Sequence, residues 1–108
     1  MAKLQKTVHG NINVIADRIR EGVLSRSSSA SLEDSSYFTE GSAKCIVLVF
    51  ERYSYAGGNR VSMNVTLFQA AQDIVHVSAI TSGGSQAMFF KLNTWGEETF
   101  LDTIREFI

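Results

Sequence analysis

The chain has 108 residues, of which 44% are hydrophobic and 10% aromatic, and this length and composition are typical of one globular domain with a single core. Its 10 basic residues stand against 11 acidic ones with no block of like charge, so neither a nucleic-acid-binding surface nor a surface for anionic membranes is indicated. The longest apolar run, Cys45 to Phe50, is far shorter than a bilayer span, and the first residues lack the apolar core of a secretory signal, so a cytoplasmic protein is expected.

The first predicted elements are a strand and a helix. Leu4 and Val8 share one side of a strand over 3–9, which Gly10 ends. Asn11 has the side chain of a helix N-cap. Behind it, apolar residues recur at helical spacing and predict one buried stripe, made of Ile12, Ile15, Ile19 and Val23.

The next segment is rich in serine, with seven serines from Ser25 to Ser36. Such a composition is typical either of a flexible linker or of a polar edge strand. We expect a loop that passes into an edge strand over 30–38. The reason is that Leu32, Tyr37 and Phe38 give this segment side chains to bury.

Residues 43–92 are predicted to form a meander of four strands. Gly57-Gly58 suits a two-residue turn, because tight hairpins require positive φ angles. The turn sets the register of the cross-strand pairs, which are Val47 with Phe68, Leu48 with Leu67, Val49 with Thr66, Phe50 with Val65, Glu51 with Asn64, Tyr53 with Ser62 and Tyr55 with Arg60. One face of this hairpin is therefore expected to be apolar and the other mixed.

A second hairpin is predicted at Gly83-Gly84. A turn at this position pairs apolar residues across the two strands in three places, which are Val75 with Leu92, Val77 with Phe90 and Ala79 with Met88. The connection near residues 70–72 is expected to have an odd length, which would put Val75, Val77 and Ala79 on the same side as Val65 and Leu67. An even length would send His76 and Ser78 into the core, where unpaired polar groups are costly.

A second helix is predicted at the end of the chain. Thr94 and Glu97 have the spacing of a capping box, and an apolar stripe follows, made of Phe100, Leu101, Ile104, Phe107 and Ile108. The expected order is β-α-β-β-β-β-β-α. The fold class is α+β, with one domain over 1–108 and an antiparallel sheet of about five to six strands packed with two helices. A curved sheet that grips the last helix is a variant of this layout.

The mixed face of the sheet carries the candidate binding residues, which are Glu51, Tyr53, Tyr55, Arg60, Asn64 and His76. One interpretation is the solvated side of an antiparallel sheet, which is polar for no functional reason. The other is a recognition surface, because tyrosine and arginine are enriched in interfaces. Val47, Val49 and Phe68 are apolar on the same face, as a dimer contact or a partly covered pocket requires.

Other chemistries find little support in the sequence. The segment Ser82 to Ser85 lacks the Lys-Ser/Thr ending and the following helix of a phosphate-binding loop. His76 and Ser82 lie about 20 Å apart along an extended strand, too far for a nucleophile and its base. The two histidines and the single Cys45 have no metal-ligand spacing. We therefore expect no catalytic residue, metal or cofactor.

Four stretches resemble a family of small uncharacterised bacterial proteins with a domain of unknown function. They are Val49-Phe50-Glu51-Arg52-Tyr53-Ser54, Asn59-Arg60-Val61-Ser62, Ser82-Gly83-Gly84-Ser85-Gln86 and Asn93-Thr94-Trp95-Gly96-Glu97-Glu98. The resemblance covers nearly the whole chain. It implies a bacterial cytosolic protein of about this length and brings no activity, cofactor or site residue with it.

Three hypotheses about function follow. The first is a non-enzymatic domain that binds a small molecule or a protein partner through the mixed face, as a homodimer. The second is a small enzyme that uses Glu51 and His76 as acid and base. The third is a structural assembly subunit. No nucleic-acid or membrane partner is expected.

Overall fold

The computed structural model describes residues 1–54, 59–83, 100–105 and 108. The elements are β1 (Ala2–His9), α1 (Ile12–Arg26), β2 (Ser31–Glu40), β3 (Ala43–Ser54), β4 (Asn59–Ala71) and β5 (Ile74–Gly83), and residues 100–105 are helical. The α+β class, the first strand and helix, and the edge strand after the serine-rich segment are confirmed. The capping box at 94–97 and Phe107 lie outside the described residues.

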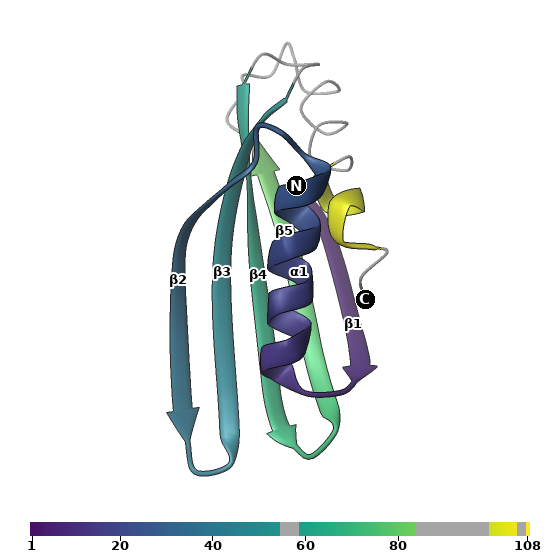
Figure 1. The fold of residues 1–108 in the computed structure, drawn as a ribbon, viewed down its shortest axis with the longest axis vertical. Coiled ribbons are helices and arrows are strands. Elements are labelled where there is room, and N and C mark those ends of the chain that lie inside the picture. The colour runs from purple at the N-terminus through teal and green to yellow at the C-terminus, as the bar shows by residue number, and fades with distance from the viewer. Residues whose placement is uncertain (55–58, 84–99, 106–107) are drawn as a thin grey trace.

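The five strands form one antiparallel sheet in the order β1-β5-β4-β3-β2 (Figure 1). Strands β2 to β5 are a meander, and β1 lies beside β5. The partner strand predicted for β5, over 85–92, lies outside the described residues. Val77 pairs with Leu67 of β4 on one side and with Lys6 of β1 on the other. Both edges of β5 are therefore occupied, and the predicted pairs with Val75, Val77 and Ala79 are wrong.

One face of the sheet forms the core together with the helices. Buried apolar side chains alternate along β3, β4 and β5, and Ile12, Ile15, Ile19 and Val23 of α1 pack on them in the same cluster as Phe100, Leu101 and Ile104. Ile108 is partly buried against this cluster. In Figure 1, α1 and the helical residues 100–105 lie on the same side of the sheet. The stripe of α1 and the described residues of the C-terminal stripe thus cover one face.

The register between β3 and β4 differs from the prediction by two residues. Phe50 pairs with Met63 instead of Val65, and Glu51 pairs with Ser62 instead of Asn64. The last pair is Ser54 with Asn59, which leaves four residues between the strands where the prediction at Gly57-Gly58 left two. Because side chains alternate with a period of two, a shift of two residues keeps every side chain on its predicted face.

A β-bulge near the end of β4 determines which side chains of β5 lie on the core face. The connection itself has two residues, Gln72 and Asp73, and the register shifts between Phe68 and Ala71. The extra residue has the effect of an odd loop length, so Ala79 pairs with Val65 on the core face, as predicted. Asp73 has a φ of 66°, a left-handed conformation that aspartate tolerates better than most residues.

Local chemistry positions the start of α1. The Oδ1 atom of Asn11 accepts hydrogen bonds from the amides of Asn13 and Val14 at 2.9 and 3.2 Å, so the predicted N-cap is confirmed. Gly10 has a φ of 139°, and a Cβ atom there would lie 3.3 Å from Cδ1 of Ile15. Both the backbone conformation and the tight space favour glycine at this turn.

Candidate functional site on the open face of the sheet

The second face of the sheet, which we call the open face, is not covered by either described helix. Directly opposed residues of neighbouring strands share a face, so the pairings define rows across it. The rows run Phe38, Cys45, Phe68, His76, Thr7; then Ser36, Val47, Thr66, Ser78, Gln5; then Asp34, Val49, Asn64, Ile80, Lys3; then Ser31, Glu51, Ser62, Ser82; and last Tyr53 and Arg60.

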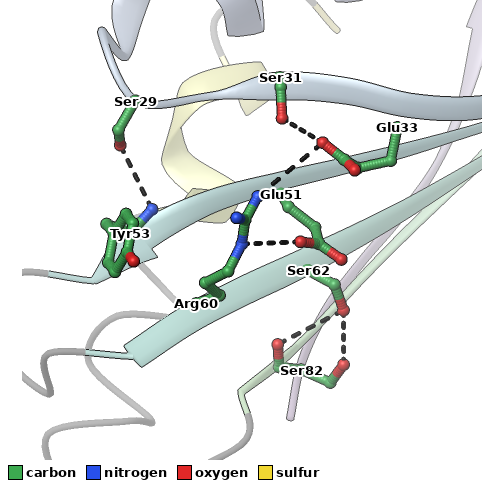
Figure 2. Close-up of polar contacts among 8 residues, drawn as sticks. All are labelled: Ser29, Ser31, Glu33, Glu51, Tyr53, Arg60, Ser62 and Ser82. Atoms are coloured by element: carbon green, nitrogen blue, oxygen red, sulfur yellow. Dashed lines mark hydrogen bonds and ion pairs between the residues drawn. The ribbon is translucent and has the colours of Figure 1, made fainter.

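A charged cluster occupies the last two rows of the open face (Figure 2). Nε of Arg60 lies 2.8 Å from Oε1 of Glu51, and its NH2 atom lies 3.9 Å from Oε2 of Glu33. The guanidinium also lies 5.7 Å from the centre of the Tyr53 ring, within the range of a cation–π contact. The structure thus brings Glu51, Tyr53 and Arg60 together, as predicted for this face.

Glu33 is a member of the cluster that the sequence did not predict. The register of β2 against β3 shifts between Leu32 and Asp34, so Glu33 is the extra residue of a bulge. A bulge breaks the strict alternation of side chains, and Glu33 reaches Arg60 on the open face (Figure 2). Alternation read along the sequence gives no signal for such a residue.

Serine hydroxyls surround the charged cluster. The Ser31 hydroxyl donates to Oε2 of Glu33, and Oγ of Ser29 accepts from the amide of Tyr53 at 3.3 Å. The hydroxyls of Ser62 and Ser82 are 2.8 Å apart. The hydrogen bond from Ser31 orients the carboxylate of Glu33, while the side chains of Glu51 and Arg60 remain partly exposed. Ionic contacts at this exposure contribute little to stability.

Apolar side chains fill much of the remaining open face. Phe38 is 62% exposed, Phe68 42% and Ile80 38%, and Val47, Val49 and the free Cys45 between them are half-buried. Single exposed apolar residues are ordinary, but a contiguous group marks a surface that binds something. The open face is therefore apolar toward the β2–β3 and β4–β5 turns and charged at its other end.

The other predicted site residues lie apart from the charged cluster. Asn64 is in the central row and accepts a hydrogen bond from the Thr66 hydroxyl at 3.0 Å. His76 lies at the apolar end, where its Nδ1 is 3.0 Å from the Thr7 hydroxyl. Tyr55 lies outside the described residues. Glu51 is level with Ser82 across the sheet, six residues along β5 from His76, which corresponds to about 20 Å. These two side chains do not meet.

An open hollow of about 740 Å³ lies at the sheet end that carries the β4–β5 turn, lined by Gly10, Asn11, Ser42, Lys44, Gln69, Ala70, Ala71, Gln72 and Asp73. Gln69 forms part of its wall. Its Oε1 accepts from the Ile12 amide at 3.1 Å, and its Nε2 donates to the oxygens of Gly10 and Ala71 at 3.1 and 3.3 Å. With Asn11 capping the next amides, the helix N-terminus is already satisfied by the protein itself.

Comparison with models of protein families identifies the family of this chain. A family model described as a family of unknown function, DUF6054, matches residues 1–108. The chain belongs to this family. A comparison with curated proteins gives no match. Membership in DUF6054 confirms the resemblance to a domain of unknown function, and the family description carries no activity or site residue to this chain.

Two further features bear on the chemistry of this DUF6054 protein. Among residues 1–54, 59–83 and 100–105, no group of three or more potential ligands could hold a metal ion. Within the same part of the chain, no helix is long and apolar enough to cross a membrane. The charged cluster of the open face combines one arginine with two carboxylates, Glu33 and Glu51, beside exposed apolar side chains.

Proposed function

We propose that this protein is a non-enzymatic interaction domain whose open face is covered by a second copy of the chain, so that it acts as a homodimer. The observation that carries the proposal is the group of exposed apolar side chains on a sheet face that no described helix covers. An antiparallel sheet can face water on one side, but that side is then normally polar. Exposed phenylalanine and isoleucine beside valine favour burial against a partner.

The size of the open face is sufficient for a dimer. The sheet has five strands, which lie about 4.8 Å apart. If the contact extends along about eight residues of each strand, at about 3.3 Å per residue, the face covers about 600 Å². Two such faces bury about 1,200 Å² in total, the lower end of the range for specific protein interfaces. Arginine and tyrosine at one end add the residue types that such interfaces favour.

Sedimentation equilibrium over a range of protein concentrations tests this function. The wild-type protein is expected to be dimeric at micromolar concentrations. Phe68→Glu should raise the dissociation constant at least tenfold, because a carboxylate on the central strand of the interface loses its water without gaining a partner. A wild-type protein that stays monomeric at the highest concentrations would refute the proposal.

Val14→Glu is the matched control. Val14 is 54% exposed, but it lies on α1, on the other side of the sheet from the open face. The substitution makes the same change of an exposed apolar side chain to a carboxylate, and the dimer should persist. Equal loss of dimer in both variants would mean that the association does not use the open face.

Small-molecule binding in the hollow beside Gln69 is a second candidate function. Its volume of about 740 Å³ lies within the usual range for small-molecule clefts, and hydrogen bonds of Gln69 fix its walls. Native mass spectrometry of the protein purified from its own host would report a bound molecule and the oligomeric state together. A mass equal to that of the polypeptide alone, or of two polypeptides, would count against a retained ligand.

A further inference from the structure

The strand order makes the open face suited to one particular two-fold arrangement. With the order β1-β5-β4-β3-β2, β4 is the central strand. A two-fold axis that lies between two stacked sheets and runs parallel to β4 places β3 over β5 of the second copy, and β2 over β1. Each row of the open face then faces the same row of the partner, read in the opposite direction.

The central row is complementary to itself in this arrangement. It runs Asp34, Val49, Asn64, Ile80, Lys3 from the β2 edge to the β1 edge. Reversed, it sets Asp34 against Lys3 of the second copy, Val49 against Ile80, and Asn64 against its own counterpart on the axis. An acidic residue therefore faces a basic one at both edges, and apolar residues face each other next to them. On the axis, the two Asn64 side chains face each other, and an amide can both donate and accept a hydrogen bond.

The charges at the two edges are available for such contacts. Asp34 and Lys3 are both exposed, and neither forms an ion pair within the described part of the chain. The carboxylate of Asp34 accepts one hydrogen bond, from the amide of Ser35 at 2.8 Å, which leaves its other oxygen open to solvent. Opposite charges at the rim of an interface fix its register and speed association more than they strengthen it.

The alternative two-fold axis, perpendicular to the strands, gives a poor match. It would place each strand over its own copy and the central row over itself unreversed. Asp34 would then face Asp34 of the partner subunit, and Lys3 would face Lys3 of the partner subunit. Like charges placed opposite each other disfavour an arrangement and exclude wrong registers. The axis parallel to β4 also brings Arg60 near its own counterpart, but there the charge of each guanidinium is offset by Glu51 and Glu33 of the same chain.

We propose, on the basis of the homodimer proposed above, that two copies stack their open faces about a two-fold axis parallel to β4, with Asp34 of each copy opposite Lys3 of the other. Packed sheets lie about 10 Å apart, and their strands cross within about 30° of each other. The two-fold axis therefore runs along β4 within about half that angle.

A charge-exchange cycle tests this arrangement. Dissociation constants are measured by sedimentation equilibrium for wild type, Asp34→Lys, Lys3→Asp and the double variant. Each single variant creates two like-charge contacts per dimer and should raise the dissociation constant roughly tenfold. The double variant restores opposite charges at both edges, and its dissociation constant should return to within about threefold of wild type. The differences should shrink at 1 M salt, because rim charges are screened.

Glu21→Lys is the matched control, since it changes the net charge by the same amount as Asp34→Lys at an exposed position of α1. It should leave dimerisation unchanged. If the single variants weaken the dimer and the double variant fails to restore it, the axis parallel to β4 is wrong. If neither single variant has an effect while Phe68→Glu still dissociates the dimer, this arrangement fails and the proposed function stands. A monomeric wild type would overturn both.

Discussion

At the scale of single residues, the start of α1 depends on the side chain of Asn11. Its Oδ1 atom is the acceptor for the amides of Asn13 and Val14, which have no partner within the helix because they belong to its first turn. Asn11→Ala should lower the free energy of unfolding by about 1 kcal/mol, measured by urea denaturation. The slope of the denaturation curve should not change, because the folded and unfolded surfaces stay nearly the same.

Asn13→Ala provides the comparison for this prediction. Asn13 is exposed inside the helix, and alanine has a higher helix propensity than asparagine. The variant should be as stable as wild type or slightly more stable. Equal destabilisation of the two variants would contradict the assignment of the cap to the Asn11 side chain.

At the scale of the elements, Gln69 joins the end of β4 to the link between β1 and α1. Its side-chain amide bonds the Ile12 amide and the oxygens of Gly10 and Ala71. Gln69→Ala removes these hydrogen bonds and leaves partly buried backbone groups without a partner, so the free energy of unfolding should fall by roughly 1–3 kcal/mol. Hydrogen exchange should also become faster at the Ile12 amide.

The neighbouring Gln72 offers a control of the same residue type. It lies in the exposed β4–β5 turn, and no hydrogen bond of its side chain contributes to this junction within the described residues. Gln72→Ala should change the free energy of unfolding by less than about 0.5 kcal/mol. If both substitutions proved equally mild, the hydrogen bonds of Gln69 would not hold the elements together.

The same elements show which parts of the fold can be predicted from the sequence. The stripe of Ile12, Ile15, Ile19 and Val23 and the cap at Asn11 follow from local periodicity and local hydrogen bonding, and both are confirmed. The face of each residue on β3 and β4 was also predictable, because a connection that is longer by two residues leaves every side chain on the same face. The register of the two strands was not predictable, because Ser54 pairs with Asn59 across a longer connection than the glycines indicated.

Long-range pairing also limited what could be predicted of the site. Glu51 and Arg60 share a face by alternation and are in contact, whereas Glu33 joins them only through the bulge in β2. The apolar matches expected for β5 at Gly83-Gly84 were misleading, because β1 is a competing partner that lies far away in the sequence. Apolar pairing alone does not distinguish between a partner strand that follows β5 directly and one at the start of the chain, such as β1.

At the scale of the whole molecule, the two described helical segments lie on the same side of the sheet. The apolar side chains of α1 and of residues 100–105 cover one face of the sheet, while Phe38, Phe68 and Ile80 remain exposed on the other. A second copy stacked on the open face would turn two layers into four, with the sheets inside and the helices outside. Each protomer would then be stabilised by its partner as well as by its own core.

Such coupling predicts that thermal stability depends on protein concentration. When the native state is a dimer and the unfolded state a monomer, a hundredfold rise in concentration adds about 2.7 kcal/mol to the stability of the dimer by mass action, and for a domain of this size the Tm should rise by several degrees. Differential scanning calorimetry measures this shift directly. Phe68→Glu should reduce the shift, while Val14→Glu should retain it, because Val14 lies on α1, away from the open face. A Tm that is constant for wild type over the same range would mean that folding and association are not coupled.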